Sequence, residues 1–397
     1  MTNSTKRASL PSWSQLGRHA VFPEATHDEI ARFNLLAQVN TFLSGQLLPG
    51  VKTSYEKRTR PRFVAEHGRE PASRQEVRRA MQQDSAYQMW SALRRNSMEQ
   101  RQQAGRSLVY RQLPRLIDAA RALNEGKATL QLDATVQSPR YATAVDIHCM
   151  PGGYHTEITQ DDVSAAANYD AGIFCTTAGM LGSYSDGGGQ AIVQWIKTNH
   201  PQFQPRRILD IGCTTGHNIV PLALAFPDAE VIAVDVAAPM LRYAHARAQS
   251  LGATSLTFRQ ANGEALDYAD ASFDLITTSM FWHETSTRAL PRILGEIHRL
   301  LAPGGLTLHL EQPQYAGMEL YEQFIRDWDT YNNNEPFWTV MHDMDLKTII
   351  ARAGFDLARY FETSMAALVD RNIFPQAGEG AQDYGRTAAW TAFGAWK

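Results

Sequence analysis

Residues 206–217, RRILDIGCTTGH, are the first indication of chemistry, because an apolar strand ends there at Asp210 and a short loop follows. Gly212 allows the backbone to turn sharply after the strand, and Gly216 lets it approach a ligand closely. The helix expected behind the loop presents unpaired N–H groups. Nineteen positions after Gly216, the strand VIAV ends at Asp235, whose carboxylate can bind both hydroxyls of a ribose. The pattern therefore predicts a pocket for a cofactor that carries adenosine.

The spacing of the glycines separates two cofactors that use such a pocket. A dinucleotide fold carries G-x-G-x-x-G under a pyrophosphate, whereas this loop has Gly212-x-x-x-Gly216. The carboxylate of Asp210, just before the first glycine, would repel a pyrophosphate. It suits a cofactor with a cationic ammonium group, and S-adenosyl-L-methionine has one.

Two downstream segments continue the same order of signals. Residues 259–282 are RQANGEALDYADASFDLITTSMFW, and residues 290–313 are LPRILGEIHRLLAPGGLTLHLEQP. With the glycine loop, they make the chain similar to class I S-adenosylmethionine-dependent methyltransferases, including the quinone-type C-methyltransferases and the small-molecule O-methyltransferases. The resemblance implies a doubly wound, Rossmann-like α/β domain of seven strands, ending in an antiparallel pair at 355–364 and 388–397.

The resemblance also implies the cofactor contacts. Asp210 would accept from the ammonium group, Asp235 from the ribose, and the Asn262 side-chain oxygen from the adenine amino group. Thr214 stands where the family commonly has glycine, and Asn262 where it often has aspartate. The other positions expected beside the cofactor are Gly212, Cys213, Gly216, Val236, Gly263, Glu264 and Ser279.

A catalytic base is expected just after the fourth strand of that domain, at the edge where open α/β sheets bind ligands. His283 lies there in SMFWHE, and histidine suits proton transfer near neutral pH. Related O-methyltransferases have a His-Asp-Trp sequence at this place, and often a glutamate after the fifth strand that orients the histidine. Glu311 is at that position. Because His283-Glu284-Thr285 departs from His-Asp-Trp, a role in acceptor binding or structure stays open for His283.

Acceptor specificity is expected after the fifth strand, in an insertion over 313–345 that is unusually aromatic. A flat or apolar small molecule would stack well on such side chains. The alternative is an amphipathic helix that uses its aromatic residues in its own core. The residues expected to bind the acceptor are Tyr154, Trp282, Tyr315, Trp328, Phe337, Trp338 and His342.

The sequence lacks the motifs of several other classes of methyltransferase. No Asn/Asp-Pro-Pro-Tyr/Phe follows the fourth strand, as in amino-directed nucleic-acid enzymes, and no Pro-Cys pair supplies a thiolate. Glu311-Gln312-Pro313 replaces the acid cluster of magnesium-dependent catechol enzymes. We therefore expect metal-free transfer to a small aromatic, polyketide-like or isoprenoid-like acceptor, first at oxygen, then at carbon or nitrogen.

The chain of 397 residues is long enough for about two domains. We expect a flexible lead-in over 1–27, and then a mainly helical domain over 28–149 with a possible β-hairpin at 128–149. Residues 150–190, rich in glycine and aromatic residues, are interpreted as a lid over the cofactor or a linker. The catalytic domain is expected over 191–397.

Charge and cysteine content add further expectations. Residues 52–115 hold fifteen Lys and Arg against six Asp and Glu, although the whole chain has a net charge of −3. Such charges usually lie on a solvated helix face, but they could bind an acidic partner, an acidic substrate or RNA. An RNA or protein methyltransferase is therefore the alternative function, and non-methylating use of the cofactor a minor one. No long apolar run or cysteine pairing pattern is visible, so we expect a cytoplasmic protein without a membrane span, possibly a homodimer through its N-terminal domain.

Overall fold

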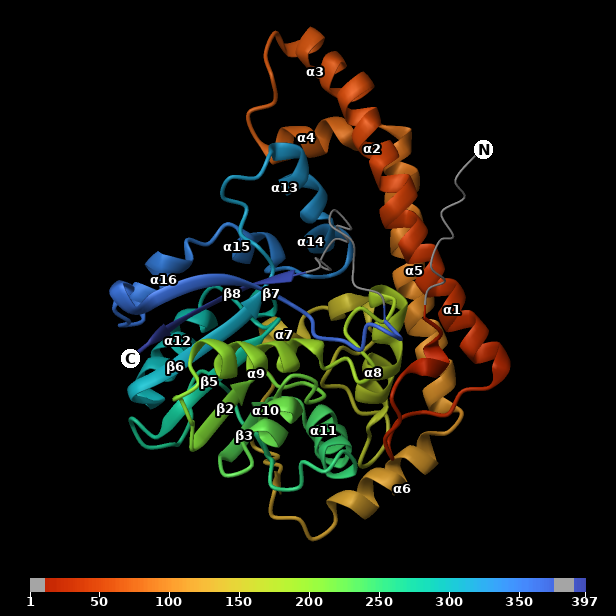
Figure 1. Cartoon of the computed structure of the whole chain (residues 1–397). Coiled ribbons are helices and arrows are strands. Elements are labelled where there is room, and N and C mark those ends of the chain that lie inside the picture. Colours follow the sequence, from red (N-terminus) through yellow and green to blue (C-terminus); the bar gives the residue numbers. More distant parts are fainter. Residues whose placement is uncertain (1–10, 375–388) are drawn as a thin grey trace.

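A computed structural model describes residues 11–374 and 389–397 and shows an α/β part with a long helical part beside it (Figure 1). The sheet has eight strands in the order β1-β4-β3-β2-β5-β6-β8-β7. Neighbours from β1 to β6 are parallel, and β8 lies antiparallel between β6 and β7. The strands are β1 (Leu130–Gln131), β2 (Arg207–Ile211), β3 (Glu230–Asp235), β4 (Thr257–Gln260), β5 (Phe273–Ser279), β6 (Leu301–Glu311), β7 (Tyr360–Ala366) and β8 (Ala389–Trp396).

The expected doubly wound sheet is thus confirmed, with the C-terminal antiparallel pair and with β1 as an additional edge strand. Successive residues of a strand face opposite sides, so both faces need a cover of helices. Ile208 packs with one core and Leu209 with the other. Helices α9 (Gly187–Asn199), α10 (Ile219–Ala225) and α11 (Ala238–Ser250) lie on one side, and α12 (Ala289–Leu300) and α16 (Leu346–Arg352) on the other.

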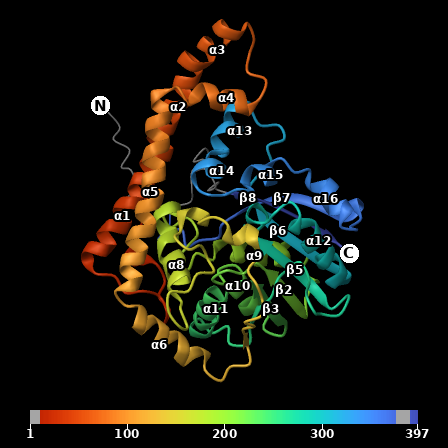
Figure 2. The same cartoon turned by 180° about the vertical axis from the view of Figure 1, so that it is seen from behind.

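The helical part is arranged around α5, which runs along one side of the molecule (Figure 2). Asp84 caps this helix by accepting from the backbone N–H groups of Ala86 and Tyr87. Thr26 and Glu29 form a capping box at the start of α1. The helices are α1 (His27–Phe42), α2 (Leu48–Ser54), α3 (Arg60–His67), α4 (Arg74–Met81), α5 (Ser85–Tyr110) and α6 (Leu113–Asn124).

Residues 150–190 connect the two parts through a buried helix, α8 (Ser164–Thr177). Small residues such as Ala166, Ala167 and Ala171 are fully buried and let α8 pack closely against α1, α5 and α11. This segment therefore joins the two parts of the molecule by packing, and the centre of the expected lid or linker belongs to the core.

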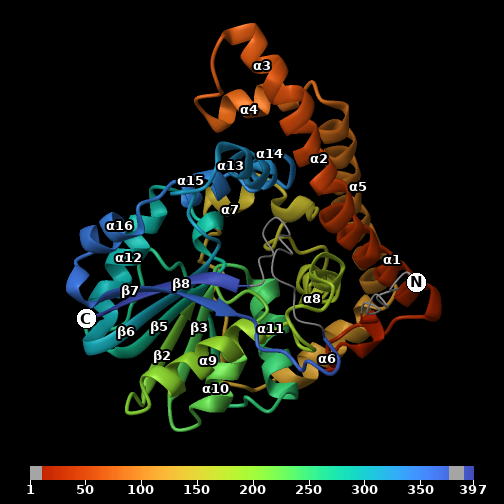
Figure 3. The same cartoon turned by 45° about the horizontal axis from the view of Figure 1, so that its top comes forward.

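The insertion after β6 forms three short helices, α13 (Leu320–Arg326), α14 (Trp328–Asn332) and α15 (Trp338–His342). They lie between the helical part and the sheet (Figure 3). Arg74 of α4 binds Asp327 at 2.9 Å, and Trp328 packs against Trp90 of α5. The insertion is thereby held against the helical part.

Two expectations for the N-terminal half differ from the structure. The possible hairpin at 128–149 is absent, because the two residues of β1 pair in parallel with β4 and are followed by the short helix α7 (Arg140–Thr143). The described part of the lead-in, from residue 11, is packed rather than loose. Trp13 is fully buried, stacks on Phe33 and donates its indole N–H to the carbonyl of Ala171. Residues 1–10 of the lead-in lie outside the described residues.

No helix in the described ranges is long and apolar enough to span a membrane.

Candidate active site

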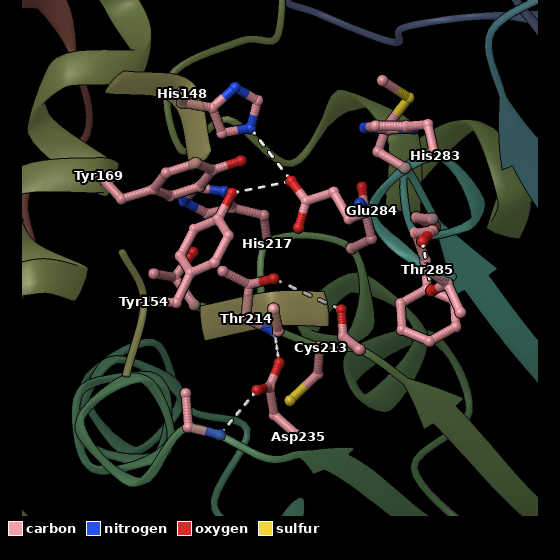
Figure 4. A pocket seen from close by; sticks show the side chains of 18 of the residues that line it. His148, Tyr154, Tyr169, Cys213, Thr214, His217, Asp235, His283, Glu284 and Thr285 are labelled. Atoms are coloured by element: carbon pink, nitrogen blue, oxygen red, sulfur yellow. Dashed lines mark hydrogen bonds and ion pairs between the residues drawn. The ribbon is translucent and has the colours of Figure 1, made fainter. Parts of the chain in front are cut away.

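A cavity of about 300 Å³ lies at the carboxyl ends of β2, β3 and β5, where α5, α8 and α15 meet the sheet. It contains the glycine loop, the end of β3 and the segment after β5, as expected for an open α/β sheet. Residues from the helical part also line it, including Arg94 and Arg101 of α5. The cavity is therefore built by both parts of the chain (Figure 4).

The loop after β2 takes its shape from left-handed backbone. Gly212 has φ of 78°, and a Cβ there would lie 2.3 Å from the ring of Phe281, so only glycine fits. Gly216 has φ of 76°. Thr214, the irregular residue of the loop, is also left-handed at φ 49°, and its backbone N–H donates to Asp235 at 2.9 Å. This bond explains how a β-branched residue is held in an unfavourable conformation.

Two carboxylates face the cavity from adjacent strands. Asp210 is buried, accepts a hydrogen bond from the Thr277 hydroxyl at 2.7 Å, and has no basic partner among the described residues. Burial, with a smaller contribution from the charge of Asp235, raises the pKa of Asp210 to about 7. Burial also raises the pKa of Asp235, although the N–H groups of Ala237 and Thr214 each donate to it at 2.9 Å. A cation between these groups would remove the desolvation cost of Asp210.

The adenine side is less complete. Asn262 and Gly263 line the cavity, but the Asn262 oxygen accepts from the Glu264 N–H at 3.0 Å. One lone pair of that oxygen remains for a ligand. Glu264 does not line the cavity and pairs with Arg292 at 3.0 Å.

The remaining expected cofactor positions, Cys213, Val236 and Ser279, do line the cavity. The Ser279 hydroxyl is buried and has no hydrogen-bond partner within the described residues. An orphan hydroxyl, a glycine-only turn and two carboxylates fit a ligand with an ammonium group and a ribose. The described residues of this wall thus suit S-adenosyl-L-methionine.

His283 lies in a short turn after β5, with its side chain 2% exposed. Its Nδ1 is 2.8 Å from the Glu311 carboxylate, and Nε2 has no hydrogen-bond partner in the described part of the chain, although the ring lines the cavity. Glu311 also accepts from the N–H groups of Phe281 and Trp282 at 2.7 and 2.6 Å. Burial opposes a charged ring, but the carboxylate outweighs it and raises the pKa of His283 to about 9. The two predicted catalytic residues therefore form a buried dyad.

A second polar cluster beside this dyad has no signal in the sequence. Nε2 of His148 lies 3.1 Å from Glu284, and Tyr154 donates to the same carboxylate at 3.0 Å (Figure 4). Nδ1 of His148 lies 2.6 Å from Glu335. Although burial opposes it, the two carboxylates raise the pKa of His148 to about 10. His148 and Cys149 are both left-handed, at φ 55° and 54°. Such strain is often found at functional sites.

The same cluster is a group of three side chains with metal-ligand chemistry. Potential ligand atoms of His148, Glu284 and Glu335 lie within 4.8 Å of one another. The two ring nitrogens face different carboxylates, so the imidazole bridges Glu284 and Glu335 in this arrangement. The absence of a metal requirement remains a prediction.

Among the residues expected to bind the acceptor, Tyr154 and Trp338 line the cavity. The Trp338 ring lies 4.9 Å from that of His283, and its indole N–H is buried without a partner among the described residues. Both residues can offer a flat surface to an acceptor. Tyr154 belongs to residues 150–190, so this segment contributes to the wall of the cavity, and its role as a lid stays a prediction.

The other five expected acceptor residues lie outside the cavity lining. Trp282 is buried against Phe393 of β8, and Phe337 contacts the ring of Tyr141. The remaining three belong to the packing of the insertion, which uses their aromatic rings as core: Tyr315 stacks on His342, and Trp328 joins the cluster with Trp90. The amphipathic-helix interpretation thus fits these three better.

Comparisons with known proteins agree with this geometry. Residues 208–305 match a family described as a methyltransferase domain. The chain is 37% identical over 109 residues to demethylmenaquinone methyltransferase of Thermus thermophilus, covering 28% of this chain and 48% of that protein. It is 39% identical over 119 residues to malonyl-[acyl-carrier protein] O-methyltransferase of Methylococcus capsulatus, covering 30% and 40%.

A longer match is to the ubiquinone/menaquinone biosynthesis C-methyltransferase UbiE of Dinoroseobacter shibae, at 27% identity over 235 residues, covering 52% of this chain and 89% of that protein. The chain spans about half the length of the first two relatives. The matched segment coincides with the strands and loop that carry Asp210, Asp235 and Asn262. The α/β part of this chain is therefore a class I S-adenosylmethionine-dependent methyltransferase domain, and its cofactor is S-adenosyl-L-methionine.

Proposed function

We propose that this protein transfers the methyl group of S-adenosyl-L-methionine to a hydroxyl oxygen of a small-molecule acceptor, with His283 as the proton acceptor. The observation that carries the proposal is the buried pair of His283 and Glu311. Nδ1 of the ring faces the carboxylate, and the ring lines the same cavity as the Asp210 loop. Bound in that cavity, the cofactor would supply a methyl group already activated on a sulfonium.

Each residue of the cofactor wall has a separate task. Asp210 would bind the ammonium group, Asp235 the ribose hydroxyls, and Asn262 the adenine amino group. The Ser279 hydroxyl is available for a further hydrogen bond. Because two carboxylates lie on one wall, a cationic ligand is favoured there over a pyrophosphate.

The opposite wall would orient the acceptor and move its proton. An acceptor hydroxyl placed against His283 can donate to Nε2, while Glu311 holds the ring through Nδ1 and stabilises the imidazolium that forms. Trp338 and Tyr154 would position a flat acceptor beside the dyad. The close packing of the helical part over the sheet would exclude water from the reacting groups.

The alternative of RNA binding by residues 52–115 receives little support. Many of its basic residues are engaged with acids instead of forming a free positive surface. These ion pairs are Arg58–Asp84, Arg60–Glu70, Arg69–Glu76, Arg74–Asp327, Arg95–Glu99 and Arg111–Glu29. A small molecule therefore remains the preferred acceptor. Carbon or nitrogen as the methylated atom, a homodimer and a cytoplasmic location stay predictions.

The test is to incubate the protein with methyl-labelled cofactor and a metabolite extract of its source, and then to identify labelled products by mass spectrometry. We expect a labelled small molecule with a new O-methyl group. Formation of S-adenosylhomocysteine without any labelled small molecule, or label found in RNA or protein, would contradict the proposal. A His283→Ala variant that keeps wild-type turnover with an oxygen acceptor would refute the role of His283.

A further inference from the structure

One face of α5 lines the cavity and carries two arginine side chains there. Arg94, Met98 and Arg101 follow one another at helical spacing and all line it. Arg101 is only 4% exposed. Its guanidinium forms no hydrogen bond or ion pair with any described residue, and its Nε is buried without a partner. A buried arginine without an anion therefore faces the candidate active site.

Other buried arginines of the molecule have polar partners. Arg94 lies 3.5 Å from Asp329, and Arg247 donates to the carbonyl of Tyr184 at 2.8 Å. A guanidinium stays charged in proteins, and a buried charge is costly unless it is paired. The unpaired state of Arg101 is therefore what we expect for a residue whose anion arrives with a ligand.

The wall around Arg101 leaves room for this side chain. Gly172 of α8 faces it, and a Cβ at that position would lie 3.1 Å from the Arg101 Nε. One turn earlier in α8, the centroid of the Tyr169 ring lies 6.0 Å from the guanidinium carbon of Arg101. Figure 4 shows Tyr169 and His283 on opposite sides of Glu284. Arg101 reaches the cavity from α5, whereas His283 reaches it from the turn after β5.

We propose that Arg101 binds a carboxylate or phosphate group of the acceptor, so that the acceptor is an anionic small molecule. This inference rests on the proposed function, because it names the acceptor class for the same cavity. The planar guanidinium can donate two parallel hydrogen bonds to either anion. The anion would be held by the helical part, while the reacting hydroxyl at the other end of the molecule lies against His283. Part of the basic segment would then recognise substrate instead of lying on a solvated face.

The test measures equilibrium binding by calorimetry, with the full chain saturated with S-adenosylhomocysteine. The probes are benzoate and phenyl phosphate, and benzamide serves as the uncharged counterpart of benzoate. We expect at least one anion to bind about tenfold or more tightly than benzamide. Arg101→Met should weaken binding of that anion roughly 10- to 100-fold, as loss of a charged hydrogen bond predicts. Binding of benzamide and S-adenosylhomocysteine should not change.

Arg106→Met is the matched control, because it removes the same charge from the same helix at a residue outside the cavity lining. It should bind the anion like the wild type. Arg101→Met removes an unpaired buried charge, so its melting temperature should stay equal or rise. A Met variant that unfolds or melts lower would assign Arg101 a structural role and overturn the proposal.

Two further results would overturn the proposal: equal wild-type affinity for benzamide and both anions, or unchanged anion affinity in Arg101→Met. Because no methyl transfer is measured, either result leaves the proposed function intact. The labelling experiment tests that function separately. The tighter of the two anions distinguishes a carboxylate acceptor from a phosphate acceptor.

Discussion

The dyad of His283 and Glu311 gives a prediction that a single atom exchange can test. In Glu311→Gln, one end of the new amide must accept from the N–H groups of Phe281 and Trp282, which now donate to the carboxylate. The amide oxygen takes that place, and the amide NH₂ then faces Nδ1 of His283. Nδ1 has to accept, so the neutral ring carries its proton on Nε2 and cannot take one from the acceptor.

The expected loss follows from the contribution of general-base catalysis. We expect kcat to fall about 10²- to 10⁴-fold with little change in KM, because the shape of the site is kept. His283→Ala should lose a similar factor, and the double variant should lose little more, since the two residues act as a unit. Cofactor affinity and melting temperature serve as controls for the fold.

The pH dependence supplies a second measure of the same dyad. With the pKa of His283 near 9, roughly one ring in a hundred is neutral at pH 7, and half are neutral at pH 9. The value of kcat/KM should therefore rise about 50-fold between these pH values in the wild type. Glu311→Gln removes the carboxylate that raises the pKa, so this rise should disappear.

Nitrogen NMR of the His283 ring reports its protonation and tautomer without any acceptor. The reasoning is refuted if Glu311→Gln keeps more than half of the wild-type turnover and the same pH profile. A wild-type ring that is neutral at pH 7 would likewise refute the assigned pKa.

Three other predictions concern the cofactor loop and the second cluster. Gly212→Ala should abolish binding of S-adenosylhomocysteine in calorimetry, because its Cβ meets the Phe281 ring, whereas Gly252→Ala, also at positive φ but with open space around it, should cost only about 1 kcal/mol of stability in denaturant titrations and leave binding intact. Because the pKa of Asp210 is raised to about 7, cofactor affinity should fall as pH drops from 8 to 6, and Asp210→Asn should bind more weakly without that dependence. The pKa of His148 is raised to about 10 in the folded state, so the charged ring stabilises the fold fully below about pH 6.5 and this stabilisation is lost as pH rises through 10. The melting temperature should fall over that range in the wild type and fall less in His148→Gln. The same fall in both proteins would contradict the assignment.

Local spacing was sufficient to predict that the loop after β2 and the end of β3 line the cavity. The loop from Asp210 to Gly216 needs glycine at two left-handed positions, and those positions are visible in sequence because few residues tolerate them. The strand that ends at Asp235 can be recognised for a similar reason. It is an apolar run that ends in a polar residue, and in open α/β sheets such strand ends lie at the ligand-binding edge. His283 belongs to the same class of signal, because it follows directly after β5.

The acceptor side was poorly predictable because its aromatic residues have two possible uses. Tyr315, Trp328 and Trp338 lie in one aromatic stretch, yet only Trp338 lines the cavity. Trp328 instead fills the contact with α5, where it lies 5.8 Å from the ring of Trp90. An aromatic side chain gains free energy from burial in either place, so sequence alone does not distinguish core from binding surface.

The sequence by itself determined the methyltransferase fold, its cofactor and the position of His283, because those features depend on backbone turns and on residues close together in the chain. Tertiary structure alone decided that His148 meets Glu284 and Glu335, and that Arg101 turns inward. His148 lies more than a hundred positions before Glu284 and Glu335 in the chain, and Arg101 comes from yet another element. The directions of these side chains follow from how the apolar faces of α5, α8 and the insertion pack. Burial then sets their charge states, which no local pattern of residues can encode.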